Sequence, residues 1–357
     1  MIKPPEYVLG IQPYVPGKPV EELERELGIS HSIKLASNEN PIGPSPAALE
    51  AIKENLSDLN RYPDGAGYYL KKALAEKLSV REEEVILGNG SNELIEVAAR
   101  TYMQDGDEAV MAVPSFVIFS MSVQSVGGKA IQIPLKNYTH DLEAMADAIT
   151  ERTKMLFIAN PNNPTGTINK KDEFEAMLKK VPDNILVVLD EAYCEYVTDP
   201  DYAKSIKYLH TKKNILIFRT FSKIYGLAGL RIGYGIAKKD IVTNMNRMRA
   251  PFNTNSMAQR AAVAALNDPQ HVSHSRNINE AGKTYLYSEL DALGVTYVPT
   301  EANFLYIPVE KAMAVYEGLL KMGVIIRPMG PAAIRVTIGL PEENSRFIEA
   351  FKRVSGS

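Results

Sequence analysis

A lysine and an arginine follow a short apolar run in the segment NILIFRTFSKIYGLAGLRIGYG, residues 214–235. Ile215 to Phe218 have the length and β-rich composition of a buried strand. Lys223 therefore lies just past the carboxyl end of that strand, the edge at which open α/β sheets bind ligands. Arg231 follows eight residues later in a glycine-rich stretch. This spacing predicts a reactive amine close to a cation that would hold an anionic group.

A carboxylate closes the preceding strand candidate, ILVVLD, at Asp190. A charge in this position needs a partner, and a helix cap or an ion pair with an arginine is the plain structural interpretation. In a parallel sheet, however, Asp190 and Lys223 reach the same edge. A pyridine ring between them would share a proton with Asp190 and bind Lys223 through an aldehyde. We therefore predict pyridoxal phosphate as cofactor, with Arg231 at its phosphate and with Tyr193 and Asn163 at its 3′ oxygen.

In the centre of the chain, strand-like apolar runs alternate with segments whose apolar residues have the spacing of a helix. The strand candidates are residues 85–88, 108–116, 129–135, 154–160, 185–190, 215–220 and 231–237. Nearly continuous apolar strands separated by helices are typical of a mainly parallel sheet covered on both faces. The remainder of the chain reads as two helices, residues 255–268 and 271–293, and then β-α-β-β-α. We expect an N-terminal arm (residues 1–29) with a short helix at 20–27, a large cofactor-binding domain (30–270) and a small α/β domain (271–357).

Composition excludes several other classes of protein. The chain has 357 residues, of which 45% are apolar and 23% charged, as in globular proteins with a large core. Its net charge of −3 favours no nucleic-acid partner. No apolar run reaches membrane-spanning length, and the first ten residues lack the pattern of a signal peptide. Cys194 is the single cysteine, which we interpret as a packing residue in a reducing compartment, so we expect a cytoplasmic protein.

Two polar segments are ambiguous by themselves. The loop GNGSNE contains Ser91 and Asn92 at the start of a predicted helix, where backbone amides bind anions, although many turns carry two glycines. It lacks the glycine spacing of a dinucleotide site and the ending of a P-loop. Asn38, within ASNENP, would either line a site entrance or form a turn.

Five motifs in fixed order resemble the fold-type-I aminotransferases of the aspartate aminotransferase superfamily. They are NPNNPTG (160–166), DEAY (190–193), SK (222–223), GLAGLRIG (226–233) and RVTIG (335–339). The segments FRTFSKIYGLAGLRIGYG, PYVPGKP, KLASNENP, RYPDG and PFNTN resemble the histidinol-phosphate aminotransferases in particular. The resemblance covers nearly the whole chain.

The resemblance implies a role for individual residues at the cofactor. Lys223 would bind the cofactor and then move the proton, while Asp190 would pair with the pyridine nitrogen. Phe116 would stack on the ring where relatives usually have tyrosine, which keeps the stacking surface but lacks a hydroxyl. Tyr62 would reach the phosphate in the neighbouring subunit and so make the enzyme a homodimer with a shared site. The residues that would hold the phosphate within one subunit are Ser91, Asn92, Ser222 and Arg231, with Asn92 where relatives often have aspartate.

The resemblance also implies a substrate pair, histidinol phosphate and 2-oxoglutarate, in histidine biosynthesis. Arg335 would grip the carboxylate of glutamate, and a bidentate arginine suits that group. We expect Arg327 on an adjacent strand to bind phosphate or carboxylate, with Tyr14 closing over from the arm and Asn38 at the substrate. The alternatives are an aromatic amino-acid aminotransferase, a decarboxylase of phosphorylated amino acids, and a pyridoxal-phosphate-binding regulator without turnover. No metal is expected.

Overall fold

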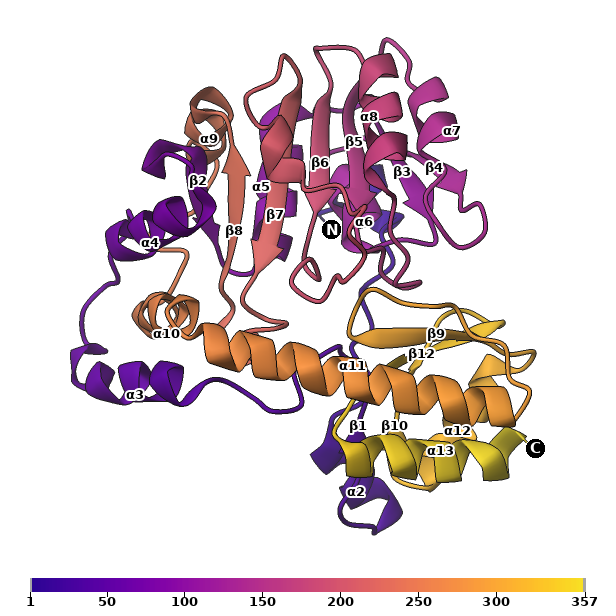
Figure 1. Cartoon of the computed structure of the whole chain (residues 1–357). Coiled ribbons are helices and arrows are strands. Elements are labelled where there is room, and N and C mark those ends of the chain that lie inside the picture. Colours follow the sequence, from indigo (N-terminus) through magenta and orange to yellow (C-terminus); the bar gives the residue numbers. More distant parts are fainter. Residues whose placement is uncertain (1, 356–357) are drawn as a thin grey trace.

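A seven-stranded sheet forms the centre of the protein, whose computed structural model describes residues 2–355 (Figure 1). Every neighbouring pair of strands is parallel except the two pairs that include β8, which are antiparallel. The strands lie in the order β2 (Val85–Gly88), β8 (Gly233–Ala237), β7 (Asn214–Thr220), β6 (Leu186–Asp190), β5 (Thr153–Ala159), β3 (Glu108–Val113) and β4 (Lys129–Pro134). The mainly parallel sheet expected from the sequence is confirmed.

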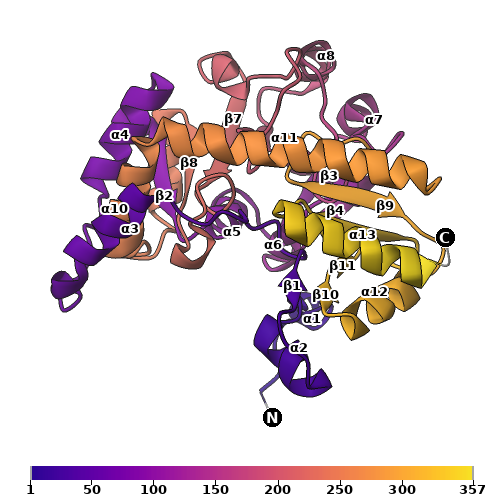
Figure 2. The ribbon, with the colours of Figure 1, turned by 60° about the horizontal axis from the view of Figure 1, so that its bottom comes forward.

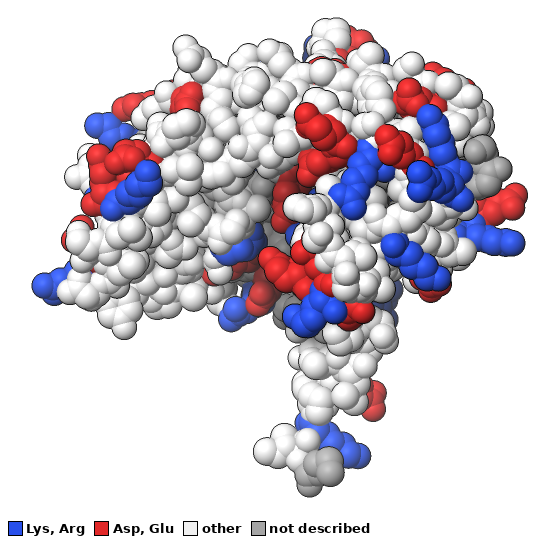
Figure 3. Space-filling model, turned by 90° about the horizontal axis from the view of Figure 1, so that it is seen from below, with Lys and Arg blue, Asp and Glu red and all other residues white. Residues whose placement is uncertain are grey.

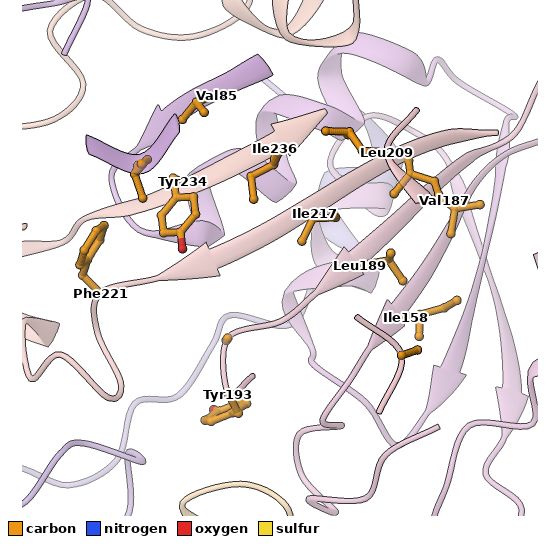
Figure 4. Close-up of a cluster of buried hydrophobic side chains, with 14 of the residues drawn as sticks. Val85, Ile158, Val187, Leu189, Tyr193, Leu209, Ile217, Phe221, Tyr234 and Ile236 are labelled. Atoms are coloured by element: carbon orange, nitrogen blue, oxygen red, sulfur yellow. The ribbon is translucent and has the colours of Figure 1, made fainter. Parts of the chain in front are cut away.

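Alternating side chains of the central strands enter two separate cores, one on each face of the sheet. Val187 and Leu189 of β6 pack into one cluster, and Leu186 and Val188 pack into the other. Figure 4 shows the first cluster, in which Val187 and Leu189 lie near Ile217 of the adjacent strand. Full burial of each such side chain stabilises the fold by roughly 1.5–3 kcal/mol. Burial on both faces explains why these strands are continuous apolar runs.

Helices cover both faces of the sheet. The cluster that contains Val187 also includes residues of α4 (Tyr68–Leu78), α7 (Leu142–Asp147), α8 (Lys171–Lys180) and α10 (Ser256–Leu266), and α3 (Pro46–Glu54) packs against α10. The opposite cluster includes residues of α5 (Ser91–Tyr102), α6 (Ile118–Gln124) and α9 (Lys239–Asn246). Side-chain caps start several of these helices; Asn255 Oδ1, for example, accepts a hydrogen bond from the Ala258 amide.

A second, smaller assembly contains the C-terminal elements. Its antiparallel sheet has the order β11 (Arg327–Pro328), β12 (Ala333–Thr337) and β9 (Phe304–Pro308), with α12 (Ala312–Lys321) and α13 (Pro341–Ser355) packed on it. The short β1 (Ile33–Lys34) pairs with β10 (Val324–Ile325), and Leu23 of α2 (Val20–Leu27) packs on Ile325. The predicted helix at 20–27 is thus confirmed. A further short helix, α1 (Glu6–Leu9), lies in the N-terminal arm.

One long helix connects the two assemblies. α11 (Pro269–Ala292) begins beside the large sheet, where His271 contacts the Gly43 carbonyl, and ends in the small core through Leu286 and Leu290 (Figure 2). Because the helix belongs to both parts, the domain boundaries 1–29, 30–270 and 271–357 stay a proposal. The pairing of β1 with β10 also ties the segment around Leu35 to the small core.

Candidate active site

A cavity of about 270 Å³ lies at the carboxyl ends of β5, β6 and β7 and is closed on its other side by the small assembly and the N-terminal arm. From below, the space-filling view shows charged side chains of both signs around a hollow between two lobes (Figure 3). The cavity brings together nearly all the site residues predicted from the sequence: Tyr14, Asn38, Ser91, Asn92, Phe116, Asn163, Asp190, Tyr193, Ser222, Lys223, Arg231, Arg327 and Arg335. Tyr62 alone lies elsewhere, in a separate hollow, with 82% of its surface exposed.

Asp190 is the last residue of β6 and is only 5% exposed. Its Oδ1 accepts a hydrogen bond from the Ala192 amide at 3.0 Å. Burial raises the pKa of the carboxyl group to about 6, and the nearby Lys223 only partly opposes this effect. A protonated ring nitrogen next to this carboxylate would offset the free-energy cost of burying its charge.

Lys223 lies in the loop that follows β7, the strand next to β6. Its Nζ donates a hydrogen bond to the Ser37 carbonyl at 3.1 Å and lies 5.6 Å from the centroid of the Tyr193 ring. Burial, followed by the positive charge of Arg335, lowers the pKa of the amine to about 8. The neutral, nucleophilic form of this amine is therefore far more populated near physiological pH than in an ordinary lysine.

An anion cradle surrounds the first turn of α5. Arg231 Nη1 donates to Ser222 Oγ at 3.3 Å, and its guanidinium lies over Gly90, the residue before the helix. A Cβ atom at Gly90 would lie 2.3 Å from Arg231 Nη2, and one at Gly233 would lie 2.6 Å from the Ser91 amide nitrogen. Gly90 also has a φ of +79°, and the contact at Gly233 is with the backbone, so both positions require glycine. The arginine, the hydroxyl and the free helix amides form a site for a phosphate group.

Arg335 on β12 faces the cavity from the small assembly. Its Nη1 donates to Asn163 Oδ1 at 2.6 Å, and its Nη2 donates to the Ala36 carbonyl at 2.7 Å. Among residues 2–355 its buried Nε has no hydrogen-bond partner. Arg327 lies directly opposite on β11, so the two predicted substrate arginines form a cross-strand pair. Because its Nε–H is unpaired among the described residues, the guanidinium of Arg335 is suited to an anionic ligand.

The aromatic ring of Tyr14 extends from the arm toward Arg327. The Cζ atom of Arg327 lies 5.2 Å from the ring centroid, within the range of a cation–π contact. Arg327 Nη2 also donates to the Val15 carbonyl at 2.7 Å. Tyr14 is 53% exposed, so this side of the cavity is open to solvent.

Asn38 is part of a buried network. Its Nδ2 donates to the Tyr193 hydroxyl at 2.9 Å, its amide donates to Thr337 Oγ1 at 2.9 Å, and its carbonyl accepts from Asn303 Nδ2 at 3.1 Å. Burial raises the pKa of Tyr193 to about 12, so the phenol remains protonated and able to donate. Sequence reasoning missed Thr337 and Asn303, since no local signal links positions so far apart in the chain.

A second network, also missed from the sequence, supports the loops that carry Phe116 and Asn163. His140 Nε2 lies 3.0 Å from Asn162 Oδ1, and Ser115 Oγ donates to the same oxygen at 2.9 Å. Burial lowers the pKa of His140 to about 4, which keeps the imidazole neutral. The network therefore ties together two loops whose next residues, Phe116 and Asn163, line the cavity. Asn162 lies within the NPNNPTG motif, but no sequence pattern links it to Ser115 or His140.

The residues of this cavity fit pyridoxal phosphate. Asp190 meets the requirement for a partner to the ring nitrogen, and Lys223 offers an amine of lowered pKa. Ser91, Ser222 and Arg231 line the same cavity and would hold the phosphate. Across residues 2–355 there is no group of three or more His, Cys, Asp or Glu side chains that would hold a metal ion. Within the same range, no helix is long and apolar enough to span a membrane.

Comparison with known families defines the class. The family model for aminotransferases of class I and II matches residues 30–351, and the chain belongs to this family. The fold agrees, since an aspartate aminotransferase mutant from Thermus thermophilus superposes with a TM-score of 0.85 at 24% identity, covering 99% of this chain and 100% of that one. The fold-type-I aminotransferase fold expected from the sequence is confirmed, as is pyridoxal phosphate as the cofactor.

Within this class, the most similar sequences belong to one enzyme family, the histidinol-phosphate aminotransferases. The enzyme of that name from Moorella thermoacetica is 51% identical over 355 residues, which cover 98% of this chain and 92% of that protein. The one from Caldicellulosiruptor saccharolyticus is 47% identical and is covered to 99% of its length. The crystal structure of the Sinorhizobium meliloti enzyme in complex with pyridoxal 5′-phosphate superposes with a TM-score of 0.91 at 28% identity, covering 98% of this chain and 96% of that one.

Proposed function

We propose that this aminotransferase transfers an amino group from histidinol phosphate to 2-oxoglutarate, and the reverse, with imidazole acetol phosphate and glutamate as the other pair. The observation that carries the proposal is the cross-strand pair of Arg327 and Arg335, which face one cavity together with Lys223. Two arginines side by side accept either a phosphate or a carboxylate, which is what the two different amino donors require. The names of the most similar relatives support the same substrate.

When bound, pyridoxal phosphate supplies an aldehyde that captures the substrate amine and a ring that withdraws electrons from the carbon to be deprotonated. Asp190 holds a proton at the ring nitrogen. Lys223 Nζ, whose pKa burial lowers to about 8, would accept and hold the proton that leaves the substrate carbon. The Tyr193 hydroxyl and the Asn163 amide would hold the 3′ oxygen of the cofactor, and Phe116 would stack against its ring.

The remaining roles follow from the chemistry of each group. The phosphate of the cofactor is bound by Arg231, Ser222 and the residues that begin α5, Ser91 and Asn92. Arg335 and Arg327 bind the anionic groups of the substrates, with Tyr14 and Asn38 beside them. Any of these assignments is tested by the kinetics of the single variant.

We also propose that the active enzyme is a cytoplasmic homodimer in which Tyr62 completes the site of the other subunit. Tyr62 stacks on Phe252, with ring centroids 4.8 Å apart, and both rings are exposed to solvent. A contiguous patch of exposed apolar side chains often marks an interaction surface. Further exposed apolar residues on the elements nearby are Leu49, Leu56, Leu59, Tyr68 and Tyr69.

The substrate is tested by turnover of the purified holoenzyme with histidinol phosphate and 2-oxoglutarate, and separately with phenylalanine and 2-oxoglutarate. We expect a much higher kcat/KM for histidinol phosphate. A preference for phenylalanine would point instead to an aromatic amino-acid aminotransferase. Release of carbon dioxide without consumption of 2-oxoglutarate would identify a decarboxylase, and absence of any turnover would identify a regulator.

The shared site is tested by mixing two defective variants. In a heterodimer of Lys223→Ala and Tyr62→Ala subunits, one site lacks both residues and the other is intact. When the two variants are mixed, unfolded and refolded together, heterodimers form. The activity divided by the number of subunits that carry Lys223 should then exceed that of the Tyr62→Ala homodimer. Activity that is merely the average of the two parent variants would contradict a shared site.

A further inference from the structure

The active-site cavity is lined by more cationic than anionic side chains, and one of the anionic side chains has no role assigned above. Four cations face it: Lys223, Arg231, Arg327 and Arg335. The only carboxylates in its lining are Asp190, assigned above to the cofactor ring, and Glu39. Glu39 has no role in the function proposed so far. A carboxylate in a cavity that binds anionic cofactor and substrate groups would repel them, so its presence there points to a substrate group that it attracts.

Glu39 is held at the cavity by a neighbouring lysine. Its Oε1 accepts from Lys34 Nζ at 3.1 Å, while no contact among residues 2–355 engages Oε2. Burial and Arg335 lower the pKa of Lys223, and the carboxylate of Glu39 is the strongest charge that acts in the opposite direction, ahead of Asp190. Glu39 and Lys223 line the same cavity, so the carboxylate and the reactive amine face the space in which the substrate must bind.

Three other acceptors in this part of the cavity each already accept a hydrogen bond. Asn163 Oδ1 and the Ala36 carbonyl accept from Arg335, and the Ser37 carbonyl accepts from Lys223. A substrate group that donates a hydrogen bond therefore finds the free oxygen of Glu39, with the Tyr14 hydroxyl as the other choice. Leaving a buried N–H without an acceptor would cost binding free energy.

From these contacts we infer that Glu39 is the specificity-determining residue for the imidazole ring of the amino donor, whose N–H donates to Glu39 Oε2. The inference rests on the proposed function and extends it to the ring. A carboxylate favours a ring that bears an N–H and can be protonated near neutral pH, and it disfavours a phenyl ring, which offers no donor. Lys34 acts through Glu39 as a positioning residue.

The same carboxylate has the opposite effect on the second substrate. Glutamate carries two carboxylates into the cavity and no side-chain donor that would pair with Glu39. Like charges at close range repel, so Glu39 weakens the binding of glutamate. The inference therefore predicts effects of opposite sign on the two half-reactions, which a purely structural role for Glu39 would not produce.

The test compares the two half-reactions of the holoenzyme in single-turnover experiments followed by the visible absorbance of the cofactor. Glu39→Ala should lower kcat/KM for histidinol phosphate about 10- to 100-fold, the range expected for a lost hydrogen bond to a charged group. The half-reaction with glutamate should become up to about fivefold faster. Glu39→Gln keeps an acceptor oxygen, so it should retain more activity with histidinol phosphate at pH 8 than at pH 6, where the imidazole is largely protonated.

A matched control and two outcomes make the test decisive. Glu50→Ala removes an exposed glutamate whose one ion pair among residues 2–355 is with Lys53, and it should change neither half-reaction. Equal losses of rate in both half-reactions of Glu39→Ala would overturn the inference. They would show that Glu39 acts through its charge on the Lys223 amine. Unchanged kinetics with histidinol phosphate would also overturn it. If the unaltered enzyme does not convert histidinol phosphate, the proposed function fails and this inference fails with it.

Discussion

The two ends of the active-site cavity are built in different ways. The cofactor end consists of residues at the strand ends and first helix turn of one sheet, whereas the substrate end is contributed by the arm, the segment after β1 and the small sheet. Asp190 and Ser222 at the cofactor end are 5% and 7% exposed, while Tyr14 at the substrate end is 53% exposed. The cofactor end comprises Ser91, Asn92, Asp190, Ser222, Lys223 and Arg231; the substrate end comprises Tyr14, Glu39, Arg327 and Arg335.

A cofactor that stays bound and substrates that exchange place different demands on the two ends of the cavity. A cofactor that stays bound needs rigid, desolvated partners, and the buried ends of parallel strands provide them. Substrates that enter and leave need an accessible wall, which elements from separate parts of the chain provide. Substitutions at the cofactor end should therefore affect both half-reactions, while those at the substrate end should distinguish between substrates.

The largest effect is expected for Lys223→Ala. Without the amine that binds the cofactor and moves the proton, turnover should fall by at least about 10⁴-fold with either amino donor. The visible absorbance of the lysine-bound cofactor should also be lost. The measurements are steady-state rates and an absorbance spectrum of the purified protein.

Lys212→Ala, which removes an exposed lysine near the amino end of β7, is the control and should keep both the spectrum and the rate. A Lys223→Ala variant that retained the absorbance band and more than about a hundredth of the activity would contradict the assignment. It would also remove the basis for separating the two ends of the cavity.

The pH dependence of folding tests the burial of Asp190 at the cofactor end and of His140 in the network that supports two of the cavity loops. The pKa of His140 is lowered to about 4, so between that value and its ordinary 6.5 the unfolded chain binds a proton that the folded protein does not. The free energy of unfolding therefore falls as the pH drops through this window. The pKa of Asp190 is raised to about 6 from 3.8, so here the folded protein binds the extra proton and the free energy of unfolding rises as the pH drops.

These two contributions oppose each other in the cofactor-free protein, and single variants should separate them. Between pH 6 and pH 5, Asp190→Asn should lose up to about 1.4 kcal/mol of unfolding free energy relative to the unaltered protein, whereas His140→Gln should gain up to about the same amount. Urea unfolding at the two pH values measures the change. Because all other titrating groups are shared, parallel pH profiles for the two variants would refute the burial of these groups.

The cofactor end was predictable from sequence because its geometry follows from adjacency. Asp190 and Phe218 are register partners on neighbouring parallel strands, so a carboxylate ending one strand and a lysine just past the other must meet. The apolar runs that define both strands are visible without any structure. His140 escaped prediction, since its contact with Asn162 joins two loops that carry no shared pattern.

The substrate end was only partly predictable. The pairing of Arg327 with Arg335 followed from two short strand candidates near each other in the sequence. The contact of Asn38 with Thr337 and the pairing of β1 with β10 join residues about 300 positions apart, which no local periodicity encodes. Glu39 was visible only as part of a polar loop, because its importance depends on which other acceptors are already engaged. The role of Tyr62 stays a prediction.

An intermediate effect is expected for Arg327→Ala at the substrate end. Loss of a charge-assisted hydrogen bond should raise KM for histidinol phosphate about 10- to 100-fold while the affinity for the cofactor stays the same. Arg335→Ala should impair both half-reactions, because Arg335 also positions Asn163. Steady-state kinetics with both donors and a cofactor titration measure these effects. Unchanged kinetics for both substrates in Arg327→Ala would show that this arginine only anchors the arm through Val15.

The smallest effect is expected at Tyr14, whose ring covers the guanidinium of Arg327. An exposed cation–π contact is worth about 0.5–1 kcal/mol, so Tyr14→Leu should raise KM for histidinol phosphate about two- to fivefold. Tyr14→Phe keeps the ring and should stay closer to the unaltered enzyme. If Phe and Leu prove equally harmful, the hydroxyl rather than the ring is what matters, and Tyr14 would compete with Glu39 as the acceptor for the imidazole. The double variant Glu39→Ala, Tyr14→Phe decides between them, since two acceptors for one N–H would give strongly non-additive losses.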